Sequence, residues 1–93
     1  MAQQTDISVP AQTWTQVTDA DVTSITFQVR ANDAVYIKGT TGAVAPTDTT
    51  GAIVYWSGQG ELNKSLSDMF PGIAAVRVYA YCDGVATVSV GHG

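Results

Sequence analysis

Few side chains in this sequence could perform catalysis, and those few are scattered. His92 is the only histidine and lies one residue before the end of the sequence, and Cys82 is the only cysteine. A nucleophilic dyad needs a base beside the nucleophile, and a metal site needs several ligands, so we expect neither. Most aspartates fall in segments typical of turns: Asp19, Asp21, Asp33, Asp48, Asp68 and Asp83. We therefore predict a protein that is not an enzyme, with no catalytic residue, no metal site and no cofactor.

Aromatic side chains are the remaining candidates for function. Tyr79 and Tyr81 alternate with Arg77, and Tyr with Arg is the composition of residues that anchor protein interfaces. Tyr55 and Trp56 end a short segment, residues 53–56, that is apolar on both sides of a strand, which indicates two covering layers or a partner. The predicted partner interface is thus Arg77, Tyr79, Tyr81, Tyr55 and Trp56. The alternative is that the tyrosine face of residues 77–81 lies under the loop at residues 39–51 as a second, minor core.

Residues 75–90 form two alternating segments that meet at an Asp-Gly pair, which is typical of a β-hairpin. A two-residue loop would set the apolar side of one strand against the polar side of the other. A three-residue loop over residues 82–84 instead pairs Val78 with Val88. We predict the second register, with Gly84 at positive φ in a bulge, because a slip of one residue would expose a whole apolar face. Arg77, Tyr79, Tyr81, Val85, Thr87 and Ser89 would then share the face away from the core.

The rest of the chain repeats this alternation. Residues 23–30 alternate most regularly, and Ser65 with Asp68 resembles a helix cap before a single helical turn that Pro71 ends. We predict one all-β domain, a small β-sandwich or jelly-roll-like fold of about seven or eight mostly antiparallel strands. Residues 6–90 form this domain, between a flexible arm at residues 1–5 and a flexible end at residues 91–93. The predicted core is Ile25, Phe27, Val29, Val35, Ile37, Val76, Val78, Ala86 and Val88.

Composition limits the possible partners. Charged residues are 13% of the 93-residue chain, and the net charge is −4 with four scattered Lys and Arg side chains. Because each phosphate contact needs a basic group, we do not expect a nucleic-acid partner. No apolar segment has the length of a membrane span, and the first residues do not have the pattern of a signal peptide. We expect synthesis in the cytoplasm and no membrane partner.

Short motifs spread over most of the chain resemble the small all-β accessory virion proteins of tailed bacteriophages. They are Val9-Pro10-Ala11-x-x-Trp14-Thr15-x-Val17, Gly42-Ala43-x-Ala45-Pro46, Gly58-x-Gly60, Val76-x-Val78-x-Ala80 and Gly84-x-Ala86-x-Val88-Ser89-Val90. The resemblance implies a non-enzymatic capsid decoration (cement) protein that binds the major capsid protein on the outside of the virion and stabilises the shell. It also implies that copies associate as a homo-oligomer on the capsid. The alternative is a tail or head-fibre module that binds a host-surface glycan through exposed aromatic side chains.

Overall fold

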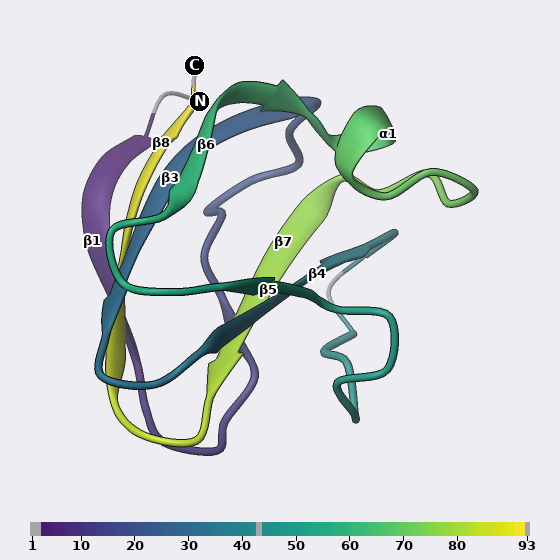
Figure 1. Ribbon diagram of the computed structural model, residues 1–93. Helices are drawn as coiled ribbons and strands as arrows, with labels where there is room; N and C mark the ends of the chain where they lie inside the picture. The colour runs from purple at the N-terminus through teal and green to yellow at the C-terminus, as the bar shows by residue number, and fades with distance from the viewer. Residues whose placement is uncertain (1–2, 43, 93) are drawn as a thin grey trace.

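Two antiparallel sheets pack face to face in the computed structural model, which describes residues 3–42 and 44–92 (Figure 1). Sheet A has the strand order β1-β8-β3-β6, and sheet B has the order β2-β7-β4-β5. The elements are β1 (Gln3–Val9), β2 (Thr15–Gln16), β3 (Ser24–Ala31), β4 (Val35–Thr40), β5 (Ile53–Tyr55), β6 (Gly60–Ser65), α1 (Leu66–Met69), β7 (Arg77–Cys82) and β8 (Ala86–His92). The predicted all-β sandwich with one helical turn is confirmed.

The strand order is that of an eight-stranded jelly roll. Four antiparallel pairs are nested in the sequence: β1 with β8, β2 with β7, β3 with β6, and β4 with β5. These are the pairs of one long hairpin. The long hairpin is rolled so that β8 also pairs with β3 and β7 with β4, which closes two four-stranded sheets around one core.

The predicted hairpin of residues 75–90 is wrong. β7 belongs to sheet B and β8 to sheet A, so residues 83–85 turn a corner between the sheets. The backbone N–H of Gln12 donates to the carbonyl of Cys82 over 2.8 Å, which runs the β1–β2 corner alongside the β7–β8 corner. Val78 and Val88 are both buried as expected, but they enter the core from opposite sheets. Apolar alternation is the same in both arrangements, because it records only which side of a strand is inside.

The expected positive φ at Gly84 is also wrong. The glycines at positive φ in the described part of the chain are Gly51, Gly58 and Gly72. A Cβ atom on Gly84 would instead lie 2.7 Å from Oδ2 of Asp33, in the β3–β4 corner. The position is therefore limited by a neighbouring flexible carboxylate and not by a left-handed backbone.

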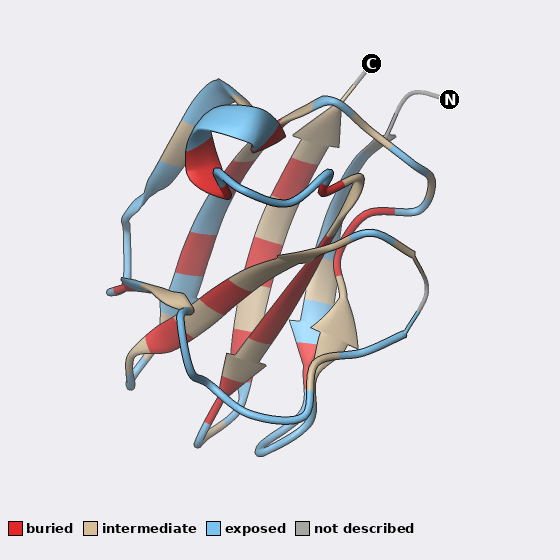
Figure 2. Cartoon of the chain, turned by 90° about the vertical axis from the view of Figure 1, so that its right-hand side faces the viewer, coloured by how far each residue is buried: buried red, intermediate tan, exposed pale blue. Residues whose placement is uncertain are grey.

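The core lies between the sheets, and buried and less buried residues alternate along the strands around it (Figure 2). All the predicted core residues are buried except Val76, which precedes β7 and is only partly covered. The helical turn closes one end of the core with Leu66, Met69 and Phe70. Its predicted cap is confirmed, because the hydroxyl of Ser65 accepts a hydrogen bond from the backbone N–H of Asp68 at 3.2 Å.

The strands extend further toward both ends of the chain than predicted. β1 begins at Gln3 and β8 ends at His92, and these two residues are partners in the antiparallel ladder. Residues 3–5 and 91–92 are therefore strand residues and not a flexible arm and end. Met1, Ala2, Ala43 and Gly93 lie outside the described residues. Polar residues 3–5 carry no apolar alternation, so only their pairing with β8 identifies them as a strand.

Candidate binding face

Three aromatic rings form a row across the outer face of sheet B. Val35, Ile37, Val78 and Ala80 face the core, so the alternate positions of β4 and β7 face outward. Tyr36 is the cross-strand partner of Tyr81, and Trp14 precedes β2 beside Tyr81. The ring centroids of Trp14 and Tyr81 are 5.3 Å apart, and those of Tyr81 and Tyr36 are 6.1 Å apart. We call Trp14, Tyr81 and Tyr36 the aromatic row.

The rings of the aromatic row are tilted against one another and only partly buried. Their interplanar angles are 40° for Trp14–Tyr81 and 55° for Tyr81–Tyr36. Val54, the partner of Tyr36 on the edge strand β5, extends the row and is 44% exposed. The aromatic row and Val54 thus reach across sheet B from the β2 side to the edge strand β5.

A second, mostly polar row lies next to the aromatic row and buries Tyr79. Gln16 and Lys38 flank Tyr79 on the neighbouring strands, and its hydroxyl lies 3.1 Å from Oε1 of Gln16. Lys38 is tied to Asp48 of the β4–β5 loop, with Nζ 3.4 Å from Oδ1, so the loop folds back toward this face. Tyr79 is 4% exposed and cannot be an exposed anchor. Tyr79 is thus a buried residue of this face and not part of an exposed aromatic patch.

Arg77 is also bound by side chains of the same chain. Its Nε atom lies 2.7 Å from Oδ1 of Asp21 in the β2–β3 connection, and its Nη1 lies 3.5 Å from Oε1 of Gln16. The guanidinium therefore fixes the β2–β3 connection to the end of β7. It is half-buried at the end of sheet B and is not a free contact for a partner.

Tyr55 and Trp56, which the sequence placed together, face different ways. Tyr55 points into the core, with its ring centroid 5.0 Å from that of Phe27, and is 6% exposed. Its hydroxyl lies 3.1 Å from Oε2 of Glu61; burial first, and then this hydrogen bond, raise the pKa of the Tyr55 phenol above its ordinary value. Trp56 follows β5 and is 58% exposed. The segment is covered on one side only, and Val54 and Trp56 remain on the surface.

The predicted interface is therefore divided by the structure. Tyr81 and Trp56 lie at the surface, whereas Tyr79 and Tyr55 are buried and Arg77 is paired. Trp14 and Tyr36, which the sequence prediction did not include, complete the aromatic row. Only the pairing of β2, β7 and β4 brings these residues together, and no local pattern records that pairing.

In the part of the chain that the structure describes, no three His, Cys, Asp or Glu side chains gather in an arrangement that could hold a metal ion. His92, whose side chain is 2% exposed, has Nε2 at 3.0 Å from Oδ1 of Asp19. Within the same residues, no helix has the length and apolar character to cross a membrane.

No protein-family model matches the chain, and no curated protein or solved structure is significantly similar to it. What the structure establishes is the class: a small jelly roll with an aromatic row on the outer face of one sheet.

Proposed function

We propose that this chain is a non-enzymatic virion protein of a tailed bacteriophage, which decorates the outside of the capsid and stabilises it. The resemblance of the sequence motifs supports the virion class. The observation that carries the binding role is the aromatic row, which leaves Trp14, Tyr81 and Tyr36 partly exposed on a regular sheet face. The proposed partner is the major capsid protein, and the proposed location is the capsid surface.

The physical reasons concern area and charge. Trp and Tyr bury a large surface while losing little side-chain entropy, so they dominate the energetics of many interfaces. The charged side chains next to the row are already neutralised within the chain, by the pairs Lys38–Asp48 and Arg77–Asp21. Docking on this face would therefore not bury either of these basic side chains without a partner of opposite charge.

Truncating the row tests the proposal. We expect Tyr36→Ser combined with Trp14→Ser to lower occupancy on purified, undecorated capsids by about tenfold or more at limiting protein, because a central aromatic contributes about 2 kcal/mol. Val85→Ser is the matched control, since Val85 is apolar, 74% exposed and placed at the β7–β8 corner. A folded double variant that binds capsids like the control would contradict the proposal.

The second candidate is the tail or head-fibre module that binds a host glycan, because exposed Trp and Tyr rings also stack on sugar rings. Imaging labelled protein on virions separates the two. Decoration requires many copies over the head, whereas a fibre module requires few copies at one vertex or at the tail.

We further propose that copies associate on the capsid through the edge of sheet B. β5 is an edge strand of three residues, and Val54 and Trp56 stand exposed beside its unpaired edge. Trp56→Ser should then reduce self-association in sedimentation experiments with capsid-bound or concentrated protein. A monomer in solution together with single, unpaired density on the shell would contradict this assignment.

A further inference from the structure

A groove of about 860 Å³ crosses the outer face of sheet A, on the opposite side of the sandwich from the aromatic row. Two cross-strand rows form it. In the first, Gly91 lies between Gln4 and Thr26, and the missing side chain leaves the floor open. In the second, Ser89 lies between Asp6 and Gln28. Its volume is within the range of small-ligand sites.

An exposed leucine forms one wall of this groove. The pairing of β3 with β6 shifts between Ile25↔Lys64 and Phe27↔Glu61, so that Leu62 and Asn63 both lie opposite Thr26. Asn63 adopts a left-handed φ of 45°, and its backbone N–H donates to the hydroxyl of Thr26 at 2.8 Å. The bulge leaves Leu62 86% exposed at the groove. Bulges re-aim side chains, and strained backbone of this kind is frequent at binding sites.

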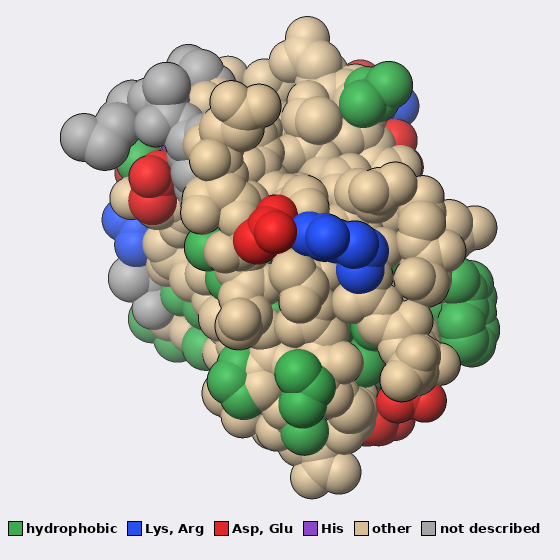
Figure 3. All heavy atoms as spheres, turned by 90° about the vertical axis from the view of Figure 1, so that its left-hand side faces the viewer, with side chains coloured by type: hydrophobic (Ala, Val, Ile, Leu, Met, Phe, Trp, Pro, Cys, Tyr) green, Lys and Arg blue, Asp and Glu red, His purple; other side chains and the backbone are tan. Residues whose placement is uncertain are grey.

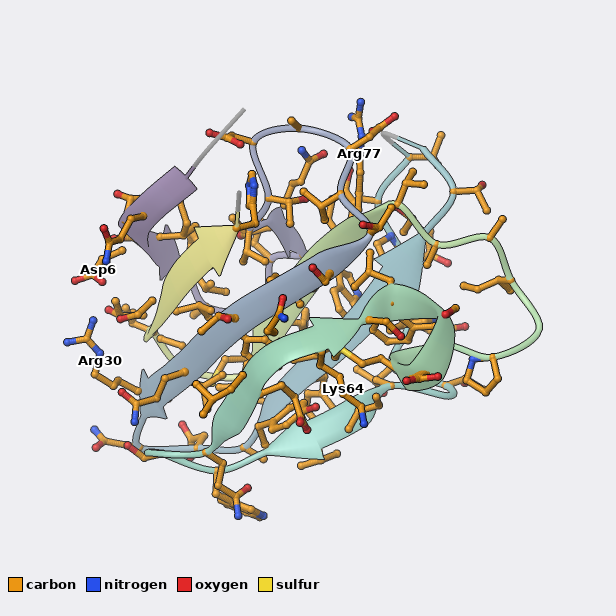
Figure 4. All side chains as sticks on the ribbon, turned by 90° about the horizontal axis from the view of Figure 1, so that it is seen from above. Asp6, Arg30, Lys64 and Arg77 are labelled. Atoms are coloured by element: carbon orange, nitrogen blue, oxygen red, sulfur yellow. The ribbon has the colours of Figure 1, made fainter. Side chains whose placement is uncertain are left out.

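The charges in the groove cancel. Arg30 Nη2 lies 2.9 Å from Oδ2 of Asp6, and the hydroxyl of Ser89 lies between them, accepting from Arg30 at 2.7 Å and donating to Asp6 at 2.8 Å. These hydrogen bonds, with that from Ser89 the larger cause, hold the pKa of the Asp6 carboxyl below its usual range. Figure 4 shows Asp6 and Arg30 pointing toward each other, far from Arg77. In Figure 3 few charged side chains lie on this face, with one adjoining acidic and basic cluster near its centre and hydrophobic side chains toward its lower edge.

We propose that the groove binds a neutral oligosaccharide. The amide, hydroxyl and carboxylate groups of its lining supply donors and acceptors for sugar hydroxyls, and Leu62 supplies an apolar contact for the C–H face of a sugar ring. A charged ligand would find no opposite charge, because Asp6 and Arg30 neutralise each other. A peptide strand would find no free backbone in the floor, because β8 and β3 each pair on both sides. The site is separate from the aromatic row and does not depend on the proposed capsid docking.

Titration of the isotope-labelled full chain, followed by backbone amide NMR shifts, tests this site. The probes are cellohexaose, maltohexaose and chitohexaose at millimolar concentration. We expect at least one of them to give saturable shifts centred on residues 4–6, 26–28 and 89–91. Leu62→Ser and Gln28→Ala should each weaken that binding by about fivefold or more, whereas Val85→Ser should leave it unchanged.

The result can overturn the proposal in three ways. The absence of saturable shifts at the groove with all three probes would do so. Shifts confined to the aromatic row would place sugar binding on sheet B and also end the assignment. Tighter binding of poly-glutamate than of any sugar to the same amides would show that the groove selects charge.

Discussion

Replacing Tyr79 by alanine distinguishes a buried residue from a docking anchor. Tyr79 lies between Gln16 and Lys38 on the outer face of sheet B and is 4% exposed. A buried Tyr covers about 150 Å², which at roughly 25 cal/mol per Å² corresponds to about 4 kcal/mol. Truncation of buried aromatics typically costs about 3–5 kcal/mol, which agrees. We expect Tyr79→Ala to lower the free energy of unfolding by about 3–4 kcal/mol and the melting midpoint by roughly 15 °C or more.

The assay is thermal and urea unfolding followed by circular dichroism, with two controls. Tyr79→Phe keeps the ring and loses only the hydrogen bond to Gln16, so it should cost about 1 kcal/mol. Val85→Ser changes an exposed side chain and should stay within about 0.5 kcal/mol of the parent. A Tyr79→Ala variant that loses less than about 1 kcal/mol but no longer binds capsids would refute the reasoning. It would show that the ring is accessible and contacts the partner directly.

Three further predictions concern the turns and the pH dependence. A Cβ atom on Gly60 would overlap the backbone carbonyl of Phe27, so Gly60→Ala should separate β6 from β3. We expect it to lower the free energy of unfolding in urea by about 3 kcal/mol or more. An unchanged free energy of unfolding would contradict the close approach of the two backbones. Gly84→Val and Gly84→Asn should each lower the free energy of unfolding by a similar, small amount of about 1 kcal/mol or less, because φ at Gly84 is not positive. A far larger loss of stability for Gly84→Val than for Gly84→Asn would indicate a left-handed backbone at Gly84 after all. The pKa of Tyr55 is raised in the folded state, so its neutral phenol contributes to stability. This contribution is complete below the unfolded-state pKa of about 10. As the pH rises above that value, the free energy of unfolding falls by up to about 1.4 kcal/mol per pH unit. Tyr55→Phe, which loses the hydrogen bond to Glu61, should be about 1 kcal/mol less stable at pH 7 but less sensitive to alkaline pH, and an identical alkaline slope in both proteins would argue against this assignment.

The sequence predicted which side of each strand is buried but not which strands are neighbours. Val78 and Val88 alternate with polar or aromatic residues, and that pattern alone puts them inside. Their predicted pairing rested on the Asp-Gly turn signal, which is local. β7 instead takes its neighbours from residues 15–16 and 35–40, and such distant pairing depends on the whole roll of the chain.

The candidate site shows the same limit. Tyr81 was correctly expected to face away from the core, yet its ring partners Trp14 and Tyr36 are distant in the sequence. Tyr79 was expected on the same face, and it is there, but it is buried and its hydroxyl is hydrogen-bonded to Gln16, which lies more than 60 residues earlier in the chain. Orientation follows from alternation within one strand, whereas exposure follows from what other segments place on top.

The corner at residues 83–85 explains how one small domain presents two different surfaces. In a hairpin, Tyr81 and Ser89 would lie on one outer face, and aromatic and hydroxyl side chains would be mixed there. Because the chain crosses from sheet B to sheet A at this corner, Tyr81 joins the aromatic row while Ser89 joins the polar groove on the far side. The inward positions Val78 and Val88 remain in one shared core. The proposed docking through the aromatic face would therefore leave the polar groove open to solvent, and substitutions in one face should leave binding at the other unchanged.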